Sequence, residues 1–345
     1  MDESASAPRL LHFTLQEYLR QHPTLFVTAQ SMMAEVCLTF LNSRPVRALI
    51  PNLLRVSEIT KFLEYATCFW GIHAVGRLTE PVKSLALQLL DGYENHVSAA
   101  VLRGREHFLQ RRDLPNSGRD LVGDVQGISG LHCIAFWGIE GIAISMLEMK
   151  RWQVNGCDSR GETPLMWAIK YRKSKMVELF LKSEGIEPDT VSGAGRTALS
   201  LAAGLRDENA VKLLLGRGDV NPDSRDRDDR TPLSFAASGG HEGVVKLLLQ
   251  CGDVNPNSSD RHGRTPLSIA ASQGYECVVK LLLDHGDVKP DSPDGNGRTP
   301  LSFAASEGHE GVAQLLLERG GVNPNPWIAM VEHPYPSLPR RDMKG

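Results

Sequence analysis

Residues 231–264 read TPLSFAASGGHEGVVKLLLQCGDVNPNSSDRHGR, and this stretch decides the fold because related copies lie on both sides of it. The copies open with Thr-Pro-Leu or a close variant at a constant spacing of 34 residues: Ser129, Thr163, Thr197, Thr231, Thr265 and Thr299. A fixed period of this size is typical of a stacked repeat array, in which each unit buries its apolar face against its neighbours. Such arrays are usually binding scaffolds.

Each part of the quoted unit has a local reason to fold as a pair of helices. Thr231 is a suitable N-cap, and Pro232 follows at the first helical position, where its missing N–H costs nothing. The glycine pair at 239–240 interrupts the first helix, and residues 244–249 then repeat apolar side chains at helical spacing. Residues 253–264 are polar and rich in turn formers, so they predict an extended connection, a finger, to the next helix pair.

These units resemble ankyrin repeats, whose pattern runs Thr-Pro-Leu-His-x-Ala-Ala, then Gly-His, then Val-Val-Lys-Leu-Leu-Leu and Gly. The resemblance implies an all-α fold, an ankyrin-repeat α-solenoid, over residues 129–320. Two features depart from the pattern. Serine replaces the usual histidine in the last four units, and each finger is one residue longer than in the family. We expect the longer fingers to extend the recognition edge.

The N-terminal segment does not repeat and is predicted to be a helical domain. Thr14 and Glu17 fit a capping box, a helix is expected over 29–42, and another is expected to start at Thr79. The predicted organisation is a helical domain at 1–110, a linker at 111–128, six repeats at 129–320 and a Pro-rich tail at 321–345. Part of the tail is expected to fold over the last helix pair, whose outer face has no neighbour.

A second resemblance covers the N-terminal segment. Residues 10–19, LLHFTLQEYL, are similar to the segment that closes the winged-helix region of fungal STAND receptors, which carry a NACHT nucleotide switch followed by ankyrin repeats. Residues 34–42, 62–66 and 85–91 resemble the helices that follow it. The sequence contains no Gly-x-x-x-x-Gly-Lys-Ser/Thr, the loop that cradles ATP phosphates. The resemblance therefore implies the sensor half of such a receptor without its NTPase.

Composition favours a soluble intracellular protein, in the cytoplasm or the nucleus. Of the residues, 41% are hydrophobic, and the net charge of -3 gives no overall basic field for direct nucleic-acid binding. The six cysteines are scattered, without the close spacing of a zinc site, and are expected to be reduced and mostly packed. No stretch has the length and apolarity of a membrane span, and the N-terminus does not resemble a secretory signal.

Three short matches to chemical motifs are better explained by the repeats. His241 and His309 each precede a glutamate, as in zinc proteases, but the second histidine four positions later is missing. Residues 193–198 loosely match a dinucleotide fingerprint, but they lie in a finger. Residues 291–296 are acidic, yet the glutamate that closes an EF-hand is replaced by serine. We expect no enzyme activity, no metal and no cofactor.

The candidate partner-binding residues lie in the fingers and at the ends of first helices: Lys170, Tyr171, Arg172, Leu205, Arg206, Arg225, Asp226, Arg227, Asp228, Asp229, Arg261, His262 and Arg298. We expect them to line the concave face of the array and to select a protein by charge complementarity. A solvated edge without a partner is the alternative. Phe136 and Trp137 are either aromatic anchors for a partner or are buried against the N-terminal helices, and burial is favoured.

The sequence is compatible with two functions. The first is a non-catalytic adaptor that regulates a protein partner, with transcription co-regulation through a bound transcription factor as its specific form. The alternative is a truncated recognition module of a fungal self/non-self receptor that works with a separate NTPase chain. The sequence does not identify the partner.

Overall fold

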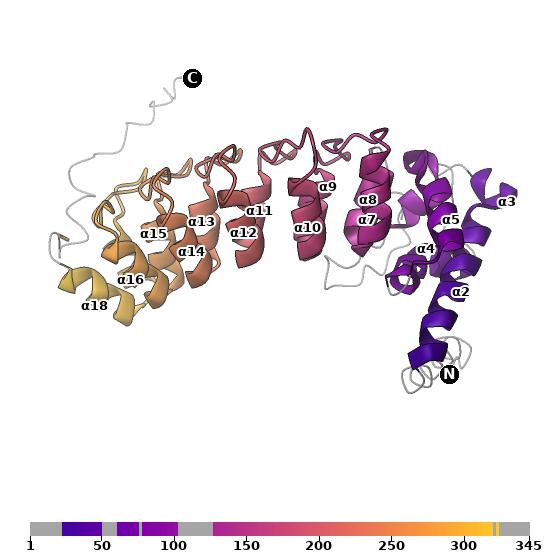
Figure 1. Cartoon of the computed structure of the whole chain (residues 1–345). Helices are drawn as coiled ribbons and strands as arrows, with labels where there is room; N and C mark the ends of the chain where they lie inside the picture. Colours follow the sequence, from indigo (N-terminus) through magenta and orange to yellow (C-terminus); the bar gives the residue numbers. More distant parts are fainter. Residues whose placement is uncertain (1–22, 50–60, 76–77, 103–126, 320–321, 324–345) are drawn as a thin grey trace, which may run out of the picture. The chain divides into compact units, whose positions relative to one another are not determined.

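The computed structural model describes residues 23–49, 61–75, 78–102, 127–319 and 322–323, and all regular secondary structure in these ranges is helical (Figure 1). The expected capping box at 14–17, the linker up to residue 126 and the capping tail from residue 324 lie outside the described residues. The chain divides into two compact units, Met1–Glu187 and Pro188–Gly345, which we call unit 1 and unit 2. No helix in the described part is long and apolar enough to cross a membrane.

Unit 1 begins with helices that do not belong to the repeats. They are α2 (Pro23–Leu41), α3 (Arg44–Arg47), α4 (Lys61–Ala74), α5 (Glu80–Leu90), the 3-10 turn η4 (Tyr93–Asn95) and a helical stretch over 97–102. Helix α2 packs on both α4 and α5. Leu38, Trp70 and Leu89 are among the side chains enclosed between these helices, each at most 1% exposed. Helix α2 starts six residues before the predicted boundary at residue 29, while α5 begins after its predicted cap, Thr79.

The other part of unit 1 consists of two helix pairs, α7 (Gly130–Trp137) with α8 (Glu140–Glu148) and α9 (Pro164–Lys170) with α10 (Ser174–Leu181). Helices α7 and α8 also contact α4 and α5. Trp137 lies against α4 at Gly71, where an added Cβ would overlap the indole ring. Phe136 and Trp137 are 8% and 6% exposed, so the prediction that they are buried against the N-terminal helices is confirmed for Trp137. Phe136 packs instead on Tyr171 of the next repeat.

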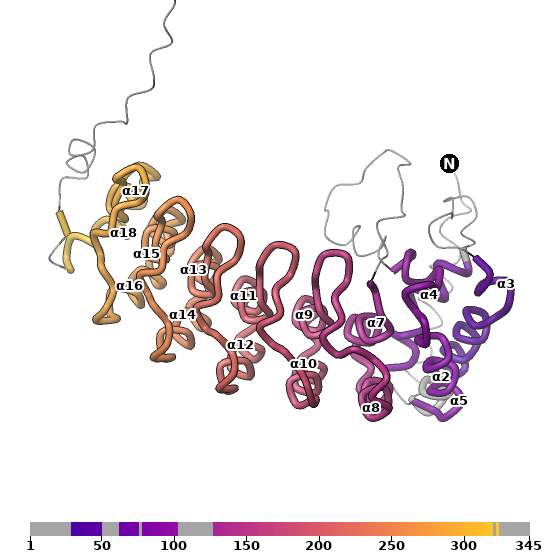
Figure 2. The backbone as a smooth tube through the Cα atoms, turned by 90° about the horizontal axis from the view of Figure 1, so that it is seen from above, coloured from indigo at the N-terminus to yellow at the C-terminus, as the bar shows by residue number. Residues whose placement is uncertain are grey.

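The described residues of unit 2 form four helix pairs. They are α11 (Ala198–Gly204) with α12 (Glu208–Leu215), α13 (Pro232–Ser238) with α14 (Glu242–Leu249), α15 (Pro266–Gln273) with α16 (Glu276–Asp284), and α17 (Pro300–Ser306) with α18 (Glu310–Glu318). First helices pack on first helices, second helices pack on second helices, and the fingers project together along one edge of the unit (Figure 2). Ala202, Ala236, Ala270 and Ala304 occupy equivalent places and are completely buried. Their small side chains let neighbouring first helices approach closely.

The predicted caps are confirmed at the start of the first helices. The Thr231 hydroxyl accepts a hydrogen bond from the Ser234 backbone N–H at 3.3 Å, and Thr163, Thr197, Thr265 and Thr299 cap their helices in the same way. The replacement of histidine by serine has a visible consequence. Nε2 of His132 lies 2.9 Å from the Glu162 carbonyl oxygen at the base of the next finger, whereas Ser234 lies 3.2 Å from the Thr231 hydroxyl of its own repeat. Ser234 therefore stabilises the cap of its own helix.

Candidate functional site

The tip of each finger in unit 2 is organised by one buried residue, five positions before the capping threonine. In the finger before α15, one carboxylate oxygen of Asp260 accepts hydrogen bonds from the backbone N–H groups of His262 and Arg264, both at 2.9 Å. The other oxygen pairs with the Arg264 guanidinium at 2.8 Å, and the Asp260 side chain is 1% exposed. Asp226 with Arg230 and Asp294 with Arg298 repeat this arrangement. The carboxylate thus closes the loop and fixes the direction of its tip.

Two fingers use variants of the same closure. In unit 1, Asp158 accepts from the Arg160 and Glu162 backbone N–H groups, but its second oxygen accepts from the Trp167 indole N–H at 3.1 Å. In unit 2, Ser192 replaces the aspartate and its hydroxyl accepts one bond, from the Arg196 N–H at 3.2 Å. The number of bonds at the tip therefore varies between repeats.

Backbone hydrogen bonds join the finger tips of unit 2 to one another. The N–H groups of Arg227, Arg261 and Gly295 donate to the carbonyl oxygens of Ala194, Asp228 and His262, at 3.2, 2.9 and 2.8 Å. Each bond runs from one finger to the preceding finger at the same register. We call the four joined tips, residues 191–196, 225–230, 259–264 and 293–298, the finger row. The fingers thus form one continuous surface.

The finger row carries more exposed positive than negative charge. Its sequence contains seven arginines and five aspartates, but Asp226, Asp260 and Asp294 have side chains at most 2% exposed. Asp228 is partly exposed and pairs with both Arg230 and Arg261. Two aromatic rings support the row from beneath, because Arg196 and Arg230 lie over Phe235, and Arg298 lies over Phe303. Solvent therefore meets mostly guanidinium groups.

The structure brings most of the predicted finger residues together. Arg225, Arg227, Asp229, Arg261 and His262 are exposed on adjacent tips, and Arg298 is partly exposed above Asp294. Asp226 corrects the prediction, because it is 6% exposed and its oxygens are used inside the finger. Burial of Asp226 follows from its place at the centre of a closed loop, which residue type alone does not reveal.

The predicted residues at the ends of first helices are placed differently from one another. Lys170 pairs with Glu162 at 2.9 Å and Tyr171 packs on Phe136 and Trp167, so both are held inside unit 1. In unit 2, Leu205 is half-buried and Arg206 is exposed. Arg172 in unit 1 and Arg206 in unit 2 have φ angles of 55° and 59°.

Arg172 and Arg206 occupy a left-handed position that other repeats fill with glycine. The equivalent residues Gly240, Gly274 and Gly308 have φ angles of 66°, 74° and 75°. A non-glycine residue in this conformation costs on the order of 1–2 kcal/mol. Unusual backbone of this kind is found preferentially at functional sites, so the two arginines are candidates for contact with a partner.

Asp229 is a third non-glycine residue in the left-handed region, at the tip of a finger. Its φ is 59°, whereas Gly195, Gly263 and Gly297 at equivalent positions have φ between 77° and 79°. We predict that Asp229→Gly raises the free energy of unfolding of unit 2 by about 0.5–1 kcal/mol, because the steric cost of Cβ is removed. Urea unfolding followed by far-UV circular dichroism measures the change. Asp229→Ala is the control: it also removes the carboxylate but keeps Cβ, and it should give no gain.

A further set of residues lies at the base of the fingers and is not recognisable as a set from the sequence motifs. Its members occupy equivalent positions, 34 residues apart: Asn155, Asp189, Asp223, Asn257 and Asp291. Asn257 makes two bonds to the next finger, donating to the Asp287 carbonyl oxygen and accepting from the Lys289 N–H, both at 2.7 Å. Asn155 does the same with Gly185 and Glu187 in unit 1. These asparagines tie one repeat to the next.

Aspartate cannot make both of these bonds while it is ionised. Asp189 accepts from the Asn221 N–H at 2.8 Å, but its other oxygen is buried without a hydrogen-bond partner, as in Asp223 and Asp291. If Asp189 were placed as Asn257 is, that oxygen would face the carbonyl oxygen of Asp219. Neither oxygen can donate a hydrogen bond to the other. Burial raises the pKa of Asp189 above its ordinary value of 3.8, the bond from Asn221 opposes this, and the Asp219 carboxylate adds to it.

We predict that Asp189→Asn stabilises unit 2 by about 1–2 kcal/mol near neutral pH, because the amide can donate where the carboxylate cannot. Because the pKa of Asp189 is higher in the folded state, ionisation of its carboxylate lowers the free energy of unfolding as the pH rises above 3.8. The gain should therefore be larger at about pH 7 than at about pH 4. Urea unfolding at both pH values measures it. The reverse change, Asn257→Asp, should destabilise the protein with the same pH trend.

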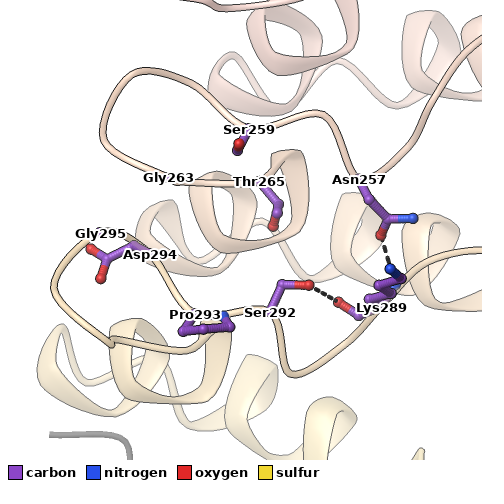
Figure 3. A pocket seen from close by; sticks show the side chains of 9 residues that line it. All are labelled: Asn257, Ser259, Gly263, Thr265, Lys289, Ser292, Pro293, Asp294 and Gly295. Carbon is purple, nitrogen blue, oxygen red and sulfur yellow. Dashed lines mark hydrogen bonds between the residues drawn. The ribbon is translucent and has the colours of Figure 1, made fainter. Parts of the chain in front are cut away.

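A shallow groove lies between the fingers that precede α15 and α17 (Figure 3). Its volume is about 390 Å³, and its walls include Asn257, Ser259, Lys289, Ser292 and Asp294. The bond between Asn257 and the Lys289 N–H lies at one side of the groove, away from Asp294. The walls are polar and the groove is open to solvent, so it is a gap between successive fingers rather than an enclosed small-molecule pocket.

The residues singled out for possible chemistry have structural roles in the described part of the chain. Nε2 of His241, at the start of α14, lies 3.1 Å from the carbonyl oxygen of Gly204, at the end of α11. This contact links one repeat to the preceding one. Cys37 and Cys133 are buried, and burial raises the pKa of each thiol to about 12. Cys68 is also buried and Cys251 is partly buried, in line with the expectation of mostly packed cysteines, whereas Cys157 and Cys277 are exposed. Within the described residues, no group of His, Cys, Asp and Glu side chains is arranged to hold a metal ion.

Comparison with known proteins identifies the repeats. Family models of ankyrin repeats match residues 160–190, 184–260 and 252–326. Residues 160–326 are therefore ankyrin repeats, whereas residues 129–159 of the predicted array, 129–320, lie outside the matches. No curated protein matches the chain in sequence.

Solved structures show the same fold. The ankyrin repeat domain of Bcl-3, described as a unique member of the IkappaB protein family, is 24% identical to the chain with a TM-score of 0.53. The match covers 57% of this chain and 88% of the Bcl-3 chain. In all, 510 solved chains match, so the fold is widely used and does not by itself select a function.

Proposed function

We propose that this chain is a non-enzymatic adaptor that binds a protein partner through the finger row of unit 2. The observation that carries the proposal is the row itself: exposed arginines stand on tips that are closed by buried carboxylates and joined by backbone hydrogen bonds. A surface held in this way needs little reorganisation to bind, which favours affinity. Ankyrin repeats are typically a non-catalytic interaction module, which supports an adaptor.

Charge reversal of the exposed arginines tests the proposal. We predict that the triple variant Arg225→Glu, Arg227→Glu and Arg261→Glu loses captured partners at least about tenfold in affinity purification, because complementary charges then repel. The matched control reverses Lys212, Lys246 and Lys280, which are also exposed, one on each of three second helices of unit 2. The control should retain the partners. Equal capture by both variants would remove the finger row from the function.

The finer function we propose is transcription co-regulation through a bound transcription factor. Its support is the fold shared with the ankyrin repeat domain of an IkappaB family member. We expect a tagged full-length protein to accumulate in nuclei, and a set of transcripts to change when the gene is deleted. Exclusion from nuclei, with unchanged transcripts, would contradict this role and leave the adaptor proposal standing.

A second candidate is a recognition module of a STAND-type receptor that works with a separate NTPase chain. The observation that favours it is the contact between the N-terminal helices and the first helix pair, where Trp137 lies on Gly71. Such continuity fits the resemblance of residues 34–42, 62–66 and 85–91 to the helices of these receptors. Co-purification of a NACHT NTPase from the cytosol with the full-length chain would support this candidate, and its consistent absence would argue against it.

A further inference from the structure

The charge of the finger row is unevenly neutralised. Arg230, Arg264 and Arg298 each pair with the buried aspartate of their own finger. Arg225 donates only to the carbonyl oxygens of Asp229 and Ser259, so its charge is not balanced by a carboxylate in the described structure. Arg261 shares Asp228 with Arg230.

Arg227 stands out within the row. Its side chain is exposed, and it makes no ion pair among the described residues, while its backbone N–H is held by the Ala194 carbonyl. The backbone of Arg227 is held in place by the finger, and its guanidinium can pair with an anion of a partner. The guanidinium groups of Arg225 and Arg227 therefore have no carboxylate partner among the described residues, and Arg261 shares its one carboxylate, so a partner could supply further anions here.

The type of cation narrows the chemistry of that partner. The row contains seven arginines, one histidine and no lysine. A guanidinium presents its N–H groups as a planar fork that matches the two oxygens of a carboxylate, whereas an ammonium acts as a point charge. Among the unmodified side chains of a protein, aspartate and glutamate carry such a pair of oxygens.

The spacing of the arginines narrows the shape of the partner. Arg227 and Arg261 occupy equivalent positions on neighbouring fingers, and the Arg261 N–H donates to Asp228 of the preceding finger at 2.9 Å. Neighbouring helices that support the fingers pack at roughly 8–10 Å. A polyproline II segment advances about 3.1 Å per residue with three residues per turn, so every third side chain points the same way after roughly 9 Å. An acidic residue at every third position would match the two fingers.

We propose that the finger row of the two central repeats of unit 2 binds an extended acidic protein segment, with carboxylates at every third residue engaged by Arg227 and Arg261. The proposal rests on the adaptor function and specifies its partner. A nucleic acid is less suitable, because the net charge of -3 gives the chain no overall basic field to attract a polyphosphate backbone.

The test measures fluorescence anisotropy of labelled peptides with the full-length chain. The first peptide consists of Glu-Pro-Ala repeats, the second has the same composition with its glutamates contiguous, and the third has glutamine in place of glutamate. We expect the spaced peptide to bind about tenfold or more tightly than either of the others, and more weakly as salt increases. Arg227→Glu with Arg261→Glu should abolish this preference, and Lys246→Glu with Lys280→Glu should leave it unchanged.

Charge exchange provides the decisive arm. A peptide of Lys-Pro-Ala repeats should bind the Arg227→Glu, Arg261→Glu variant and not the unaltered chain, which separates direct pairing from a loss of folding. Equal binding of the spaced and contiguous peptides would overturn the proposal, as would arginine-dependent binding of a single-stranded oligonucleotide that is tighter than that of the spaced peptide. If partner capture still depends on the arginines while the peptides fail, the adaptor function stands and the acidic segment is rejected.

Discussion

Asp260→Ala is expected to lower the free energy of unfolding of unit 2 by about 2–4 kcal/mol, because it removes three interactions of one buried carboxylate. The N–H groups of His262 and Arg264 lose their acceptor, and the Arg264 guanidinium loses its partner at 2.8 Å. The finger can then no longer close, although every helix keeps its own caps. Urea unfolding followed by far-UV circular dichroism is the appropriate measurement, because the five tryptophans lie at 70, 137, 152, 167 and 327, outside the repeats of unit 2.

The chain offers two matched comparisons for this substitution. Asp253 is exposed, and Asp253→Ala should change the free energy of unfolding by no more than about 0.5 kcal/mol. Asp260→Ser should fall between the two, since Ser192 closes its finger with one side-chain bond to Arg196. A loss that is equal for Asp260→Ala and Asp253→Ala would show that the buried carboxylates do not hold the fingers.

The second large effect concerns the glycine two residues before Thr265. Gly263 has a φ of 79°, and a Cβ there would lie 2.6 Å from the backbone nitrogen of Gly295 on the next finger. We expect Gly263→Val to lower the free energy of unfolding by about 3 kcal/mol, because left-handed backbone is unfavourable for a β-branched residue and the neighbouring backbone must move. That movement would break the bond from the Gly295 N–H to the His262 carbonyl oxygen. Urea unfolding of the full-length chain measures the loss.

Two further variants separate the backbone angle from the contact. Asparagine adopts the left-handed region more readily than valine. Gly263→Asn should therefore keep the clash between Cβ and the neighbouring finger, but the positive φ should destabilise it less than it destabilises Gly263→Val. Gly252→Val is the control, since a Cβ at Gly252 meets nothing within 4 Å and its φ is not positive. If Gly252→Val were as destabilising as Gly263→Val, the contact between neighbouring fingers would not be the cause.

Local sequence was sufficient for the architecture of the repeats. Thr231 and Pro232 begin a helix by rules that act within one turn, and the 34-residue period requires each unit to pack on a copy of itself. The boundary of α2 was less predictable, since no capping motif marks Pro23 as its start. The candidate surface was predicted in outline, because exposed charges at finger tips follow from their position between helices.

The sequence by itself determined that repeated helix pairs stack and that arginines lie in the connections, because periodicity and composition are properties of the chain. Only the tertiary structure decided which charges face solvent: Asp226 and Asp228 are two residues apart, yet one closes its finger and the other faces an arginine of the next finger. Likewise, Asn257 is satisfied and Asp189 is not, because the neighbouring repeat presents both a donor and an acceptor at that place. The physical reason is that burial and hydrogen bonding depend on groups about thirty residues away, which a local pattern does not contain.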